Sequence, residues 1–192
     1  MNSGVLHFFN DMVGKSAVMD GVAKFLIQGS MVIIPLVLVL VFLLGIFLKR
    51  EKYRIVAINT LGIIIICLLV GYGIGHSVNE TRPMFALAHV NILLPHANDS
   101  SFPSDHTLLC FGAAFGFYLL SRKLGVVLTI FGVLVGLAKI YAAQHYPWDI
   151  LLTIVVVFAI FVLYRIFALR PVSWLYTTVE RRVLPSLHKP AA

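Results

Sequence analysis

The chain has 192 residues, of which 60% are hydrophobic and 12% charged, and its mean hydropathy is +0.96. A water-soluble domain carries about a quarter charged residues, so this composition excludes one and indicates a polytopic membrane protein. The formal net charge of +7 does not indicate nucleic-acid binding, because the basic residues stand at the ends of apolar runs, as membrane anchors do.

The N-terminal segment, residues 1–27, mixes apolar and charged side chains at roughly helical spacing. We expect an amphipathic helical arm at the membrane interface, with an ordinary soluble helical arm as the alternative. The first ten residues lack a basic region followed by an apolar core and a small-residue cleavage site. A cleaved signal peptide is therefore not expected.

Apolar runs make up most of the rest of the chain, and a membrane-crossing helix needs about 20 residues. Five such runs follow the arm: 30–48, 55–74, 107–120 (of spanning length if it begins at 104), 124–138 (reaching 143 if Lys139 is included) and 150–169. The sequence predicts an all-α, polytopic membrane helical bundle with five transmembrane helices, or six if the N-terminal arm also crosses. We expect one membrane-embedded domain over residues 1–192, with a cytoplasmic tail at 171–192.

Basic residues predict the orientation of the bundle. They gather after the first, third and fifth runs, at 49–54, 122–123 and 165–189, which the positive-inside rule assigns to the cytoplasm. The N-terminus is then outside and the C-terminus inside. All three polar clusters described next fall on the outer face.

The first of these clusters, Pro103-Ser104-Asp105-His106, immediately precedes the third apolar run. A helix that begins here points unpaired backbone N–H groups and its positive dipole end outward, which suits an anion. Ser104 is expected to act as a cap or as a hydroxyl donor. Capping alone is the alternative, but it does not account for His106 in the first turn.

The second cluster lies at the start of the fifth run, where His145 and Asp149 are four residues apart and Pro147 favours the first helical turn. A carboxylate one turn from an imidazole can accept from one ring nitrogen and leave the other as a nucleophile. The alternative is a helix-start pair in which Asp149 only complements the dipole.

Two cationic side chains complete the set of candidate site residues. Arg82, before Pro83, supplies a planar fork suited to phosphate oxygens, whereas Lys139 either snorkels to the interface or serves the site. Acidic residues are dispersed, and Cys67 and Cys110 read as buried apolar side chains, so no metal and no cofactor are expected. Phosphoryl transfer through a covalent histidine fits this inventory.

The three segments resemble the signature of the type-2 phosphatidic acid phosphatase superfamily, Lys-x6-Arg-Pro, Pro-Ser-Gly-His and Ser-Arg-x5-His-x3-Asp. The string from Leu94 to His106 is closer still to the bacterial undecaprenyl pyrophosphate phosphatases of the bacitracin-resistance type. The match covers roughly residues 60–165 in order and spacing. It implies a helical bundle whose site lies at the outer membrane–water boundary.

The resemblance also implies a role for each matching residue. His145 would attack the terminal phosphorus, Asp149 would orient it, and His106 would protonate the leaving lipid phosphate and then activate water. The phosphoryl oxygens would be held as charge develops. The residues assigned to that phosphate site are Arg82, Lys139, Ser104, Pro103 and Asp105.

Three positions depart from the signature. Gly75 replaces the first lysine, and neighbouring His76 is a partial substitute. Lys139 replaces an arginine, which exchanges a bidentate fork for a point charge and predicts weaker phosphate binding or slower turnover. Asp105 replaces a glycine, as expected in the undecaprenyl branch.

The function expected from this resemblance is undecaprenyl pyrophosphate phosphatase, which recycles the lipid carrier of cell-wall synthesis at the outer face of a bacterial cytoplasmic membrane. Alternatives are a lipid A phosphotransferase, a phosphatidylglycerophosphate phosphatase, or a non-catalytic transporter or sensor, against which the intact histidines argue. Expected partners are the polyprenyl pyrophosphate and the bilayer, and the oligomeric state stays open. No catalytic role is assigned to the remaining loop and terminal histidines His7, His89, His96 and His188.

Overall fold

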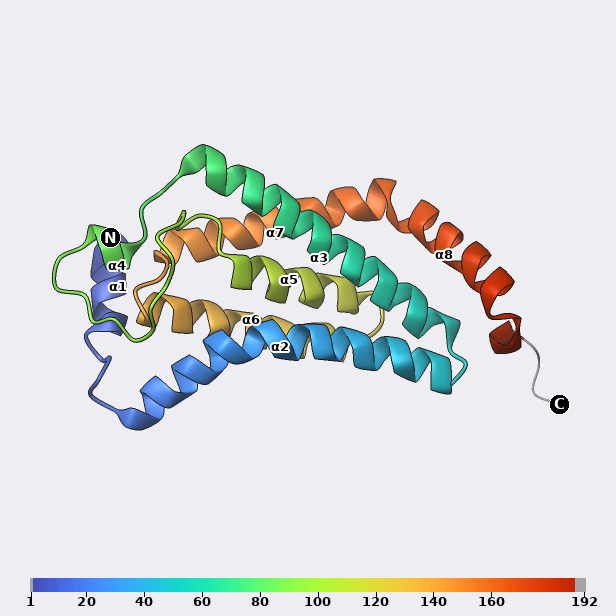
Figure 1. Ribbon diagram of the computed structural model, residues 1–192, viewed down its shortest axis with the longest axis horizontal. Helices are drawn as coiled ribbons and strands as arrows, with labels where there is room; N and C mark the ends of the chain where they lie inside the picture. Colours follow the sequence, from blue (N-terminus) through green and yellow to red (C-terminus); the bar gives the residue numbers. More distant parts are fainter. Residues whose placement is uncertain (1, 189–192) are drawn as a thin grey trace.

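The computed structural model describes residues 2–188, and the named elements in that range are all helical (Figure 1). They are α1 (Asn2–Asn10), α2 (Ala17–Phe47), α3 (Glu51–Val78), α4 (Pro83–Ala86), α5 (Asp105–Tyr118), α6 (Arg122–Tyr141), α7 (Pro147–Phe167), α8 (Leu169–Val183) and a 3-10 turn at Pro185–His188. The predicted all-α helical bundle is confirmed.

Four of the described helices, α2, α3, α6 and α7, are long and apolar enough to cross a membrane. The predicted third span corresponds to α5, which has 14 residues and is therefore about 21 Å long, against about 30 Å for a hydrocarbon core. Most of α5 is buried, because it packs against α2, α3, α6 and α7. The predicted count of five or six spans is therefore not confirmed.

The N-terminal segment differs from the single interfacial arm expected over residues 1–27. α1 ends at Asn10, and α2 begins at Ala17, where the Ser16 side chain accepts a hydrogen bond from the backbone N–H of Met19. From there α2 continues without a break to Phe47. The first long helix thus starts well before residue 30, because the N-cap at Ser16 begins the helix ahead of the apolar run.

α2 and α3 form the opening that positions the site. They are joined by the turn at 48–50 and diverge toward the other end of the bundle, where α2 changes direction (Figure 1). Pro35 lies inside α2, and a proline there removes a backbone hydrogen bond and bends a helix. The N-terminus of α5 and the 79–104 segment occupy the diverging end.

The opposite end of the bundle is closed by a buried ion pair. Arg54 of α3 donates from Nε and Nη2 to the carboxylate of Glu180 at 2.6 and 2.9 Å, and from Nη1 to the carbonyl of Gly45 at 2.6 Å. Two parallel bonds of this kind fix α8 in orientation as well as distance. Much of the tail expected over 171–192 is therefore a packed helix, and residues 189–192 lie outside the described range.

α3 and α5 approach each other closely at Gly116. A Cβ atom built on Gly116 would lie 2.5 Å from the Thr60 hydroxyl oxygen and 2.8 Å from the Thr60 Cβ. Gly73, on α3, has open space around it instead. Close packing of α3 and α5 near the C-terminal end of α5, away from the site, thus depends on a missing side chain at Gly116.

Gly116→Ala should lower the free energy of unfolding by about 1–3 kcal/mol, because the added methyl forces the two helices apart. Gly73→Ala is the matched control, and it should leave stability unchanged or raise it by up to about 1 kcal/mol through helix propensity. Thermal unfolding in detergent measures both. Equal midpoints for the two variants would contradict the close contact.

Candidate active site

The segment that carries Arg82 and the segment that leads into His106 are joined directly by backbone pairing. Thr81 and Ser100 form an isolated antiparallel bridge, and the N–H of Ser101 donates to the carbonyl of Glu80 at 2.7 Å. The Ser100 hydroxyl also accepts from the N–H of Glu80 at 3.2 Å. This pairing holds Arg82 next to the segment that leads into α5.

The segment that carries His145 packs against these two segments through the turn between α6 and α7. The N–H of Met84 donates to the carbonyl of Ala143 at 2.9 Å. Arg82 Nη1 donates to the carbonyl of Gln144 at 3.0 Å. Residues that are more than 60 positions apart in the chain thus lie in direct contact.

His145 is the centre of this assembly and is only 1% exposed. Its Nδ1 lies 2.6 Å from the carbonyl oxygen of Ser101, and its Nε2 lies 3.0 Å from Nη1 of Arg82. A carbonyl only accepts and a guanidinium only donates, so Nδ1 carries the proton and Nε2 presents its lone pair. The arrangement selects a neutral imidazole with its free nitrogen aimed at a cation.

Asp149 supports His145 through a serine, which differs from the direct contact expected. Its carboxylate lies 3.8 Å from His145 Nδ1, but it accepts from the Ser101 hydroxyl at 2.5 Å and from the N–H of Tyr146 at 2.8 Å. Tyr146 is the N-cap of α7 and Asp149 the third helical residue, so the carboxylate folds back onto the cap. Ser101 therefore connects the acid and the imidazole, using its hydroxyl for one and its carbonyl for the other.

The start of α5 carries an unpartnered hydroxyl. Ser104 is the N-cap residue, but its side chain does not cap the helix. Its Oγ is buried and, within residues 2–188, has no hydrogen-bond partner, while its N–H donates to Thr153 Oγ1 at 3.1 Å. The capping predicted for the Ser104 side chain is thus absent, and the hydroxyl is available to a ligand.

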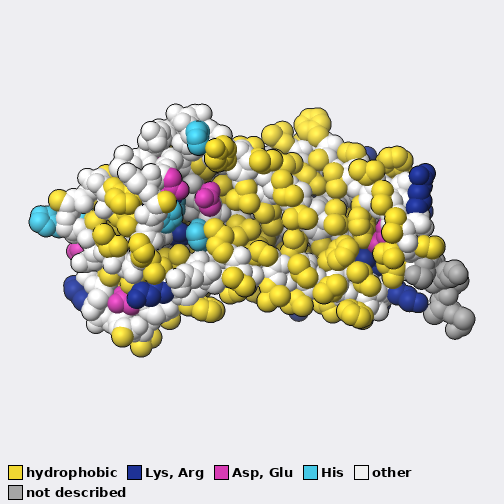
Figure 2. All heavy atoms as spheres, in the orientation of Figure 1, with side chains coloured by type: hydrophobic (Ala, Val, Ile, Leu, Met, Phe, Trp, Pro, Cys, Tyr) yellow, Lys and Arg dark blue, Asp and Glu magenta, His cyan; other side chains and the backbone are white. Residues whose placement is uncertain are grey.

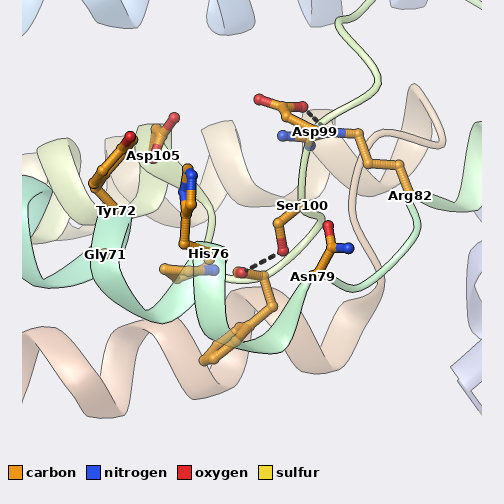
Figure 3. Close-up of a pocket in the computed structure, with 11 residues that line it drawn as sticks. Gly71, Tyr72, His76, Asn79, Arg82, Asp99, Ser100 and Asp105 are labelled. Carbon is orange, nitrogen blue, oxygen red and sulfur yellow. Dashed lines mark hydrogen bonds and ion pairs between the residues drawn. The ribbon is translucent and has the colours of Figure 1, made fainter.

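Two cavities open at the end of the bundle that holds His145, where acidic and histidine side chains gather in a hollow (Figure 2). One of about 360 Å³ lies along α3, and its lining includes Arg82, Pro103 and Asp105, with Asp105 and His76 reaching the same side (Figure 3). The other, of about 220 Å³, lies along α2, and its lining includes His106 and Lys139. All the predicted phosphate-site side chains thus lie at this end.

Lys139 and His106 lie on the α2 side of the site. Lys139 is 1% exposed and donates from Nζ to Oε1 of Gln144 at 2.8 Å. The charges of Lys139 and His145 both act on His106, so the two predicted catalytic histidines share one electrostatic environment. Gly75 lines the cavity along α3. The cavity therefore lies beside the position where the signature has a lysine.

The 87–104 segment supplies residues that the sequence analysis missed. Asp99 accepts from Arg82 Nε at 2.8 Å, and its carboxylate lies 3.4 Å from Nδ1 of His96, a residue given no role above. Ser101 and Asp99 lie within the string from Leu94 to His106 that resembles the family, and nothing else in the sequence indicated a role for them. The indication for Gln144 was clearer, since a polar amide directly before the key histidine in an apolar stretch needs hydrogen-bond partners.

The proton affinity of His145 provides a test of this geometry. Burial, together with the positive charges of Arg82 and Lys139, lowers the pKa of His145 below its ordinary value of 6.5 against the opposing effect of Asp149. The folded protein therefore binds this proton less tightly than the unfolded chain. The contribution of His145 to stability is present above pH 6.5 and is lost as the pH falls through the folded pKa.

Nitrogen NMR of histidine-labelled protein should show His145 neutral, with its proton on Nδ1, as the pH is lowered through 6.5. Exposed His89, on the 87–104 segment, gives a second histidine signal in the same spectra. Titration of His145 at or above 6.5, or a proton on Nε2, would contradict the hydrogen bonds described here.

Comparisons with known proteins show which family the chain belongs to. The sequence pattern of the PAP2 superfamily matches residues 56–172. Undecaprenyl-diphosphatase BcrC of Bacillus subtilis (strain 168) is 31% identical over 191 residues, covering 98% of this chain and 96% of that protein. The Bacitracin transport permease protein BcrC of Bacillus licheniformis is 29% identical over 194 residues, covering 98% and 94%.

Among solved structures, the crystal structure of Aquifex aeolicus LpxE matches with a TM-score of 0.68 at 22% identity, covering 86% of this chain and 95% of that one. This likeness concerns the fold alone. The superfamily pattern, in contrast, spans all three segments that meet at His145. On that match, and on near full-length similarity to curated relatives, the chain belongs to the PAP2 superfamily.

Proposed function

We propose that this protein is a membrane lipid phosphatase that hydrolyses undecaprenyl diphosphate to undecaprenyl phosphate through a phosphohistidine at His145. The observation that carries the proposal is the Nε2 lone pair of His145 held 3.0 Å from Arg82 Nη1, a nucleophile placed against a phosphate-binding cation. Full-length similarity to a relative named as an undecaprenyl-diphosphatase supports the choice of substrate.

In the first step the terminal phosphate enters the hollow at this end of the bundle, and its oxygens accept hydrogen bonds from Arg82 and from Lys139. Ser104 Oγ, buried and unpartnered within the described residues, adds a third donor. Nε2 of His145 attacks phosphorus, a P–N bond forms, and the P–O bond to the lipid phosphate breaks. Protonated His106 gives its proton to the departing oxygen.

In the second step His106, now neutral, accepts a proton from water as the water oxygen attacks the phosphohistidine. The P–N bond breaks, inorganic phosphate leaves, and His145 and His106 return to their starting states. The Ser101 carbonyl balances the imidazolium-like ring during both steps by holding the Nδ1 proton. Asp149 acts through the Ser101 hydroxyl, so both are positioning residues.

The lipid can reach this site from within the bilayer. The hollow lies on the side of the bundle, and apolar side chains cover the surface that runs from it along the long helices (Figure 2). Some dark blue side chains lie at the end that holds the hollow, and others gather at the far end, where the 48–50 turn and α8 lie. Because that basic end favours the cytoplasm, we place the hollow at the outer face.

Hydrolysis uses features that transport would not. One relative is named as a transport permease and another as a diphosphatase. A buried imidazole with a selected tautomer and a free lone pair serves covalent chemistry, whereas carrying an anion would need only the cations. The geometry therefore favours a phosphatase.

His145→Ala should lower phosphate release from undecaprenyl diphosphate by on the order of 10⁴-fold or more, the scale seen when a covalent nucleophile is lost. Purified protein is assayed with undecaprenyl diphosphate, phosphatidylglycerophosphate and lipid A in parallel, with and without chelator. His7→Ala, on α1, is the control and should retain wild-type rates.

Four outcomes would contradict the proposal, the last of them in its substrate alone. Undiminished release by His145→Ala would remove the nucleophile, and complete loss on chelation would indicate a metal-dependent reaction. Transfer of phosphate to lipid A without release would indicate a phosphotransferase. Preference for phosphatidylglycerophosphate would keep the chemistry and change the substrate.

Ser101→Ala should reduce kcat by about 10- to 100-fold, the range found when a group that orients a reacting residue is removed. The variant keeps the Ser101 carbonyl but breaks the link to Asp149. Ser77→Ala, which removes a hydroxyl that donates to the Gly73 carbonyl in α3, is the matched control. If Ser101→Ala retains full kcat while Asp149→Ala loses it, Asp149 does not act through Ser101.

A further inference from the structure

Gln144 occupies a defined position in the turn that ends α6. The N–H of Gln144 donates to the carbonyl of Lys139 at 3.0 Å, and the N–H of Ala143 donates to the carbonyl of Ile140 at 3.0 Å. Ala143 has a φ of 53°, and these two bonds with a left-handed residue define a Schellman motif. In this motif the two residues at Lys139 and Gln144 normally make a hydrophobic contact, which is replaced here by a polar one.

The Gln144 side chain has one orientation that satisfies both of its neighbours. Its Oε1 accepts from Lys139 Nζ at 2.8 Å, and its Nε2 donates to the carbonyl of Leu94 at 3.3 Å. An ammonium only donates and a carbonyl only accepts, so the amide cannot be reversed. Glutamate would lose the donor to Leu94, and an apolar residue would lose both bonds.

Gln144 also contacts the second cation, since its backbone carbonyl accepts from Arg82 Nη1 at 3.0 Å. It is 1% exposed, so water does not compete for these bonds. Within residues 2–188, Lys139 has no carboxylate within ion-pair distance, and Gln144 is a neutral partner. The ammonium is therefore held in place while its charge stays unneutralised.

We propose that Gln144 is a positioning residue that aims Lys139 at the phosphoryl group and so offsets the replacement of the arginine of the family signature. An arginine fork fixes its own geometry through two parallel bonds, whereas an ammonium on a flexible stem does not. The hydrogen bond from Lys139 to Gln144 fixes the ammonium in place instead. This inference rests on the proposed function only in taking the bound group to be a phosphate.

The test uses inorganic phosphate as the probe, so that it does not depend on identifying the lipid. Phosphate binding is measured as the rise in thermal midpoint with phosphate concentration, and as inhibition of lipid diphosphate hydrolysis. Gln144→Met keeps the length and apolar volume but removes both polar atoms. Its dissociation constant for phosphate should rise about tenfold, the effect of losing a hydrogen bond to a charged group. Thr129→Val, which removes a side-chain bond to the Gly125 carbonyl on the same helix, should bind phosphate as wild type does.

A double-mutant comparison separates positioning from general stability. If Gln144 acts through Lys139, Gln144→Met adds nothing to the loss caused by Lys139→Ala, whereas independent effects multiply. Gln144→Glu gives a second measure should Gln144→Met not fold, because a carboxylate of the same shape neutralises Lys139 and should weaken phosphate binding further. Multiplying effects, or wild-type phosphate affinity in Gln144→Glu, would overturn the proposal. Failure of wild type to hydrolyse the lipid would refute the proposed function and leave this test in place.

Discussion

The hydrogen bond between Arg82 and His145 is the contact on which the rest of the site depends. A guanidinium beside an imidazole is tolerable only while the imidazole is neutral and turns its lone pair toward the cation. Ser101 enforces this by taking the Nδ1 proton on its carbonyl. Under the proposed function the phosphate enters at this contact, because an anion that accepts from Arg82 in place of Nε2 releases Nε2 for attack.

The fold brings this contact about with a few local devices. A one-residue bridge, Thr81 with Ser100, joins two of the segments, and the turn after α6 adds the third. The short α5 lies inside the bundle, so its N-terminus, with the buried Ser104 hydroxyl, lies at the same end as the hollow. The divergence of α2 and α3 leaves this hollow open, while Arg54 and Glu180 hold the other end closed.

The residue types and spacings predicted much of this arrangement. Apolar runs predicted a helical bundle, and the polar clusters around Arg82, His106 and His145 do meet at one end. The partner of His145 was not predictable, because a backbone carbonyl carries no signature in one sequence. Gln144 indicated only that it needs partners, and not that Lys139 is one of them. Asp149 was expected on the imidazole, yet capping geometry turns it to Ser101 instead. The span count is not confirmed at α5, since hydropathy does not distinguish a buried core helix from a lipid-facing one.

The covalent step is the central claim, and trapping the intermediate tests it most directly. Purified protein is mixed with diphosphate lipid labelled in its terminal phosphate, quenched in alkali within milliseconds to seconds, and mapped by mass spectrometry. The account predicts an acid-labile phosphate on Nε2 of His145. Turnover with label on another residue, or with no labelled protein at any time, would contradict it.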